Sequence, residues 1–152
     1  MAMDTKVFFR YPDEPDEPAG RAPEFLADAS SQEWSTLLTY AQARHLRRGE
    51  TLYSEGDRDG ALYVLTIGAV DVRASGSAPV TLEPPATLGE VPFLDDGVAL
   101  ETVTATTDTE LLRLSRDAFE VLSAREQQLA QRILRDLART LAATLRAKPP
   151  AA

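Results

Sequence analysis

Residues 49–73 read GETLYSEGDRDGALYVLTIGAVDVR, and this stretch decides the fold of the 152-residue chain. Residues 50–55 and 69–73 alternate between apolar and polar side chains, which is the period of a half-buried strand. Between them, residues 61–65 form a short apolar run. Glycine and aspartate separate the three segments, as expected where a chain turns. The stretch therefore predicts several short antiparallel strands.

The same pattern continues as far as Leu114. A turn at residues 75–77 precedes a short strand at 80–82, and two more strands are predicted at 102–105 and 110–114. Many short strands with turn residues between them are typical of an antiparallel roll, barrel or sandwich.

Helical patterns lie on both sides of these strands. Residues 23–43 predict a helix that Ser30 or Ser31 can cap. Ser115 predicts the start of a short helix over 118–122, and a longer helix follows over 125–147. Its apolar stripe has to cover the roll or a second subunit, and we favour the roll; the stripe comprises Leu129, Ile133, Leu137, Leu141 and Leu145.

The predicted fold class is therefore α+β: an antiparallel β-roll of the double-stranded β-helix or jelly-roll type, with an N-terminal helix and C-terminal short and long helices. We expect residues 1–22 to form an extended lead-in, because repeated proline and acidic residues at 11–18 cannot pack a core. Residues 23–147 form the domain, and residues 148–152 are a tail.

Composition excludes several classes of function. The chain has no cysteine and a single histidine, His45, so we expect no catalytic residues and no metal ligands. A net charge of −8 argues against nucleic acid as a partner of this chain alone. No apolar run approaches the roughly 18 residues of a membrane span. With no basic-then-apolar leader, we expect a cytoplasmic protein.

The order of elements, together with particular residues, resembles the cyclic nucleotide-binding domain family, of the catabolite-activator and protein-kinase-A regulatory type. Gly49 and the Glu55-Gly56-Asp57 turn look like the family's opening motif "G-E-x-L-x-x-E-G-D". Leu62-Tyr63 with Gly68, Val70 and Val72 resembles "L-Y-x-x-x-x-G-x-V-x-V". Residues 88–103 resemble its phosphate-binding cassette, and residues 111–119 resemble "L-L-x-L-x-x-x-x-F".

The resemblance implies a ligand pocket built around this cassette and closed by the last helix. The expected pocket residues are Gly89, Glu90, Val91, Phe93, Ala99, Leu100 and Thr102. The expected lid residues are Leu137, Thr140, Leu141 and Thr144. Glu90 stands where the family places its ribose-binding carboxylate.

Three positions of the cassette depart from the family pattern "G-E-x-A-L-L-x-x-x-P-R-x-A-T-V". Ala99 stands where the family has its phosphate-binding arginine, and residues 89–112 contain no arginine at all. Pro92 replaces a small residue that offers its backbone N–H, and proline has none. Glu101 adds a negative charge where alanine is usual. Cyclic AMP and cyclic GMP are therefore possible but disfavoured ligands, and we expect no cofactor.

Three functions remain open at this point. The first is a non-catalytic regulatory or interaction module, with a protein partner or a second copy of the chain bound through the C-terminal helix. The second is a small-ligand sensor of altered specificity, which would take a neutral or cationic ligand. The third is the sensor fragment of a catabolite-activator-type transcription regulator.

Overall fold

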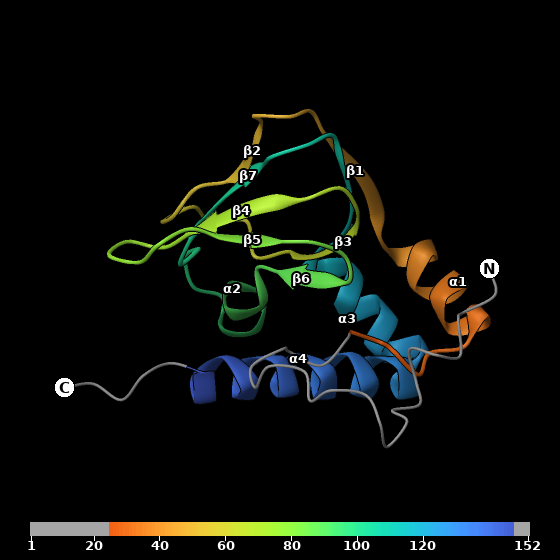
Figure 1. The fold of residues 1–152 in the computed structure, drawn as a ribbon. Helices are drawn as coiled ribbons and strands as arrows, with labels where there is room; N and C mark the ends of the chain where they lie inside the picture. The colour runs from red at the N-terminus through yellow and green to blue at the C-terminus, as the bar shows by residue number, and fades with distance from the viewer. Residues whose placement is uncertain (1–24, 148–152) are drawn as a thin grey trace, which may run out of the picture.

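The computed structural model describes residues 25–147, so the predicted lead-in and tail lie outside the described residues. Helix α1 precedes the strands, α2 interrupts them, and α3 and α4 follow them (Figure 1). The helices are α1 (Ser31–Tyr40), α2 (Glu90–Asp95), α3 (Arg116–Arg125) and α4 (Gln127–Ala147). The strands are β1 (Gln42–Leu46), β2 (Thr51–Tyr53), β3 (Leu62–Ile67), β4 (Val70–Arg73), β5 (Val80–Leu82), β6 (Ala86–Leu88), β7 (Thr102–Ala105) and β8 (Thr109–Leu114).

The strands form two four-stranded sheets with antiparallel pairing throughout. One sheet has the order β1-β8-β3-β6, and the other has the order β2-β7-β4-β5. The predicted α+β class and β-roll are confirmed. In Figure 1 the roll stands above α4, with α2 between them and α1 and α3 at one end.

Strand β3 explains the apolar run seen in the sequence, because both of its faces are buried. Leu62 and Val64 pack against the helices, in a core that includes residues of α1, α3 and α4. Tyr63 and Leu65 point the other way, into the interior of the roll, where they join residues of the second sheet. A strand covered on both faces needs apolar residues at consecutive positions rather than at alternate ones.

The N-terminal helix is shorter than predicted. It is capped as expected, since the Ser30 hydroxyl accepts a hydrogen bond from the Glu33 N–H at 3.1 Å and Glu33 binds back to the Ser30 N–H at 3.2 Å. The prediction of helix over 23–43 is wrong at its ends: residues 25–28 form a turn, and residues 42–46 form β1. Residues 42–46 are a strand and not a helix because β1 pairs with β8, which is distant in the sequence.

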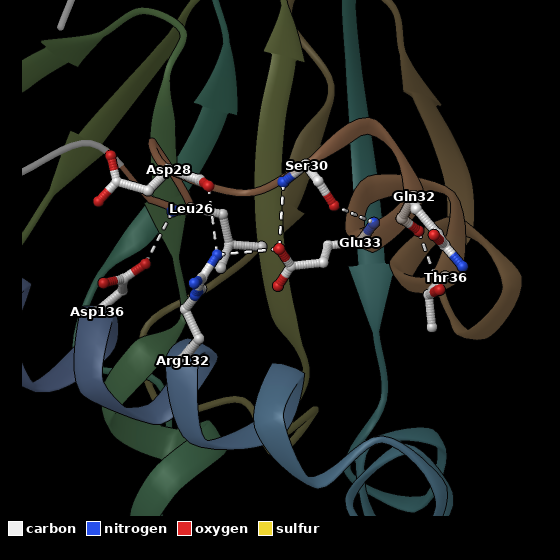
Figure 2. A network of polar contacts seen from close by, with 8 residues as sticks. All are labelled: Leu26, Asp28, Ser30, Gln32, Glu33, Thr36, Arg132 and Asp136. Atoms are coloured by element: carbon white, nitrogen blue, oxygen red, sulfur yellow. Dashed lines mark hydrogen bonds and ion pairs between the residues drawn. The ribbon is translucent and has the colours of Figure 1, made fainter.

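Helix α4 lies along the roll and is held there by apolar packing and polar contacts. Leu129, Ile133 and Leu137 are fully or almost fully buried in the core shared with α1 and α3. Figure 2 shows the polar side of the same attachment: Asp136 accepts a hydrogen bond from the Leu26 N–H at 2.9 Å, and Arg132 pairs with Glu33 at 3.0 Å. The favoured prediction, that this stripe covers the roll, is confirmed for its first half.

Candidate ligand-binding site

A groove of about 1030 Å³ opens between the roll and α4. Its walls come from the β4–β5 hairpin, from residues 83–92, which include β6 and the start of α2, and from residues 99–101. The second half of α4 closes one side. Apolar atoms form the larger part of the lining.

Most of the residues predicted for the pocket lie in this groove. Gly89, Glu90, Val91, Ala99 and Leu100 line its roll side, and Thr140, Leu141 and Thr144 line its helix side. The other three predicted residues do not line it. The Phe93 ring meets Phe119 edge-on at 5.2 Å, Thr102 Oγ1 accepts a hydrogen bond from the Glu55 N–H at 3.0 Å, and Leu137 is in the helical core.

Gly89 holds the tight connection between β6 and α2. Its φ of 76° is in the left-handed region, and a Cβ atom placed there would lie 2.7 Å from the Ala61 carbonyl oxygen. Only glycine accepts both the angle and the close approach. The backbone of α2 is thereby brought directly against the roll.

Glu90 begins α2 and is largely buried at the edge of the groove. Thr87 Oγ1 donates a hydrogen bond to Glu90 Oε1 at 2.5 Å. Burial raises the pKa of Glu90, and the Thr87 hydrogen bond opposes this without cancelling it.

Arg116, the first residue of α3, binds the C-terminal end of α2. Its Nη2 donates to the carbonyl oxygens of Pro92 and Phe93, each at 2.8 Å, and its Nη1 lies 2.6 Å from Asp96 Oδ1. The guanidinium thus gives the carbonyls at the C-terminal end of this short helix a hydrogen-bond partner, although the Pro92 carbonyl also accepts from the Asp96 N–H. Arg116 does not line the groove.

Comparison with known proteins identifies the fold. The sequence model of the cyclic nucleotide-binding domain matches residues 43–126, more than half of the chain. The chain belongs to the cyclic nucleotide-binding domain family. Residues 88–103, which resemble the family's phosphate-binding cassette, run from the end of β6 through α2 to the start of β7.

Two curated relatives and one solved structure illustrate the similarity. The cyclic AMP receptor protein of Thermus thermophilus is 32% identical over 115 residues, covering 72% of this chain and 53% of the relative. A cyclic AMP-dependent protein kinase regulatory subunit of Yarrowia lipolytica is 30% identical over 99 residues, covering 64% of this chain and 26% of the relative. A cyclic nucleotide-binding domain from Methylobacillus flagellatus superposes with a TM-score of 0.72 at 27% identity, covering 80% of this chain and 71% of that one. The chain spans about half the length of the first of these relatives.

Several other residues line the groove that the sequence does not predict as site residues, Tyr53 and Glu101 among them. Tyr53 is only 6% exposed, and its hydroxyl has no hydrogen-bond partner among the described residues. Burial raises the pKa of Glu101, and the negative charge of Glu90 raises it further. The only sequence signal for Tyr53 is its place in the alternating segment 50–55, and Glu101 stands out in the sequence only as an unfavourable charge.

Among residues 25–147 no helix combines the length and the apolar character needed to cross a membrane. In the same range, no three His, Asp or Glu side chains gather as they would around a metal ion.

Proposed function

We propose that this domain is a non-catalytic regulatory or interaction module that does not bind cyclic AMP or cyclic GMP in the usual way. One observation carries the proposal. By the resemblance, Ala99 stands at the cassette position of the phosphate-binding arginine, and both Ala99 and the carboxylate-bearing Glu101 line the groove. A phosphate that entered the cassette would therefore meet a carboxylate instead of a guanidinium.

The loss of affinity for a cyclic nucleotide can be given as an order of magnitude. A hydrogen bond to a charged partner contributes roughly 1.5–3 kcal/mol, so loss of the arginine alone lowers affinity by about tenfold to a hundredfold. Glu101 acts in the same direction, since like charges at short range repel most strongly where water is partly excluded. Pro92 lines the groove as well and has no N–H to donate.

A regulatory role is supported by the relatives, whose names describe a receptor protein and a kinase regulatory subunit. A protein partner or a second copy of the chain would bind α4 at Leu134, which is 41% exposed and does not line the groove. Sedimentation velocity of the full chain and of Leu134→Arg tests this binding mode. Equal sedimentation coefficients for the two proteins would contradict self-association through that part of α4.

A second candidate function is a sensor for a different small ligand. It is favoured by the size of the groove and by the unpartnered Tyr53 hydroxyl inside it.

Thermal unfolding of the full chain with cyclic AMP and cyclic GMP tests the main proposal. A ligand present at about 100 times its Kd stabilises the folded state by roughly 2.7 kcal/mol. We expect no rise in melting temperature with either nucleotide, and no heat of binding in a calorimetric titration. A clear rise in melting temperature together with a saturable heat would overturn the proposal.

A further inference from the structure

The charged residues that line the groove are all of one sign. They are Glu83, Glu90 and Glu101, and no lysine or arginine is among the described residues of the lining. A site of this kind repels a phosphate or carboxylate and attracts a positive charge.

The two deeper carboxylates retain capacity to accept hydrogen bonds. Glu90 accepts a hydrogen bond from Thr87 at one oxygen, while no hydrogen bond contributes to the pKa of the Glu101 side chain. Burial works against ionisation of both groups, and the charge of Glu90 adds to the effect at Glu101. A cation between them would relieve this repulsion and supply the missing donors.

Tyr53 is an independent observation that points to a ligand. Its ring packs in the interior of the roll, 5.9 Å from the ring of Tyr63, while the residue also lines the groove. The Gly89 N–H approaches the hydroxyl without reaching the geometry of a hydrogen bond. A buried hydroxyl left without a partner is costly, and a ligand N–H would satisfy it.

The rest of the groove is mostly apolar, and this part of the lining would contact the body of the ligand. Leu82, Leu100 and Leu141 line it from three different elements or loops, and Leu145 lies at the end of α4. Such walls favour an aliphatic or aromatic group, and the carboxylates favour a charged head on that group.

Resting on the proposed absence of ordinary cyclic nucleotide binding, we propose that the groove binds an organic cation: a primary ammonium group carried on an apolar body. The ammonium group donates to Glu90, Glu101 and the Tyr53 hydroxyl, and the body packs against the leucine side chains.

Calorimetric titration of the full chain tests this assignment with matched probes. Tryptamine and n-hexylamine carry the ammonium group, while tryptophol and n-hexanol replace it with a neutral hydroxyl. We expect both amines to bind, and each alcohol to bind at least about tenfold more weakly than its amine. Equal binding of amine and alcohol, or no binding of either amine, overturns the inference.

Three variants test whether the amines bind in this groove. Glu101→Gln and Glu90→Gln should each weaken amine binding by about tenfold or more, and Tyr53→Phe should weaken it several-fold. Glu110→Gln removes an exposed carboxylate outside the groove and should leave binding unchanged. Tyr53→Phe should not lower the melting temperature of the free protein, because its hydroxyl has no partner there. Unchanged affinity in the three groove variants would overturn the site.

A cyclic AMP titration run beside these separates the two proposals. If cyclic AMP binds, the proposed function fails whatever the amines do. If neither cyclic AMP nor the amines bind, only the cation inference fails.

Discussion

The backbone of Ala99 is paired with that of Asp57: the Ala99 N–H donates to the Asp57 carbonyl at 2.8 Å. The Ala99 carbonyl in turn accepts from the Gly56 N–H, also at 2.8 Å. The turn that follows β2 therefore fixes the position of residue 99 through main-chain atoms alone. Because these bonds involve no side-chain atom, we expect an arginine at position 99 to keep the same backbone pairing at the groove.

Restoring the cassette should therefore create binding. We expect the triple variant Pro92→Ala, Ala99→Arg, Glu101→Ala to bind cyclic AMP or cyclic GMP by calorimetry, since it regains a cation and a backbone N–H and loses a repelling charge. The control carries Pro92→Ala and Glu101→Ala with Val121→Arg, an exposed position on α3 outside the groove. This control has the same net charge as the triple variant and should bind neither nucleotide. Binding by the control would show that net charge, not the cassette, is responsible.

Glu101→Gln should stabilise the free protein. Burial raises the pKa of Glu101 above its ordinary value of 4.5, so the folded state resists its ionisation more than the unfolded chain does. The wild-type protein carries this penalty above the raised pKa and loses it below 4.5, where the group is protonated in both states. At neutral pH we expect a gain of about 0.5–2 kcal/mol in the free energy of unfolding, measured in urea.

The pH dependence of that gain is the stricter check. The difference between Glu101→Gln and wild type should shrink as the pH falls toward 4.5. A difference that persisted at lower pH would mean that the variant stabilises the fold by another route.

Asp59 should make the free energy of unfolding depend on pH in the opposite direction to Glu101. Burial alone would raise its pKa, but hydrogen bonds from Arg113, at 2.7 Å, and from Tyr63 outweigh that effect, and the pKa lies below its ordinary value of 3.8. The pair therefore stabilises the fold above 3.8, and the contribution is lost as the pH falls through the lowered pKa. Because both side chains are partly exposed, we expect Asp59→Asn to cost only about 1 kcal/mol in urea unfolding.

A double-mutant cycle with Arg113→Gln isolates this interaction. The coupling energy should be favourable and should decrease below pH 3.8. Additive effects of the two single variants would show that the residues act independently.

Gly68→Ala should be among the more destabilising single substitutions on the roll. The φ of Gly68 is 95°, and a Cβ atom there would lie 2.5 Å from the Asp108 carbonyl oxygen. Gly76 is the matched control, since its φ is 77° but a Cβ atom would meet nothing within 4 Å. We expect Gly76→Ala to cost about 1–2 kcal/mol for the left-handed angle alone, and Gly68→Ala to cost about 2 kcal/mol more. Equal costs in urea unfolding would mean that the loop at Asp108 yields freely.

The two halves of α4 should respond differently to truncation. Leu137 is fully buried in the helical core, whereas Leu145 is 71% exposed at the groove. Leu137→Ala should therefore cost about 2–5 kcal/mol and Leu145→Ala less than about 0.5 kcal/mol, as measured in urea. A large cost at Leu145 would show that the end of the helix is more tightly packed than its exposure indicates.

The sequence by itself determined the elements whose signals are local. The capping residues Ser30 and Ser115 mark helix starts that the structure reproduces, with hydrogen bonds to Glu33 and Ala118. Turn residues divided the strands correctly because a turn depends on the conformational freedom of one or two residues. The prediction that the cassette lacks a guanidinium and an N–H is local in the same sense, since each is a property of one residue, and it stays a prediction.

Only the tertiary structure decided what depends on distant partners. Strand β1 has exposed side chains at every position except Leu46, so it lacks an apolar pattern, and it forms because β8 pairs with it. Strand β6 is likewise set by its pairing with β3. Burial is a property of the assembled roll, which is why the unpartnered hydroxyl of Tyr53 and the raised pKa of Glu101 could not be derived from the chain. The sequence predicts an unfavourable phosphate site at Pro92, Ala99 and Glu101, and the fold shows that Tyr53, Glu90 and Glu101 line one groove.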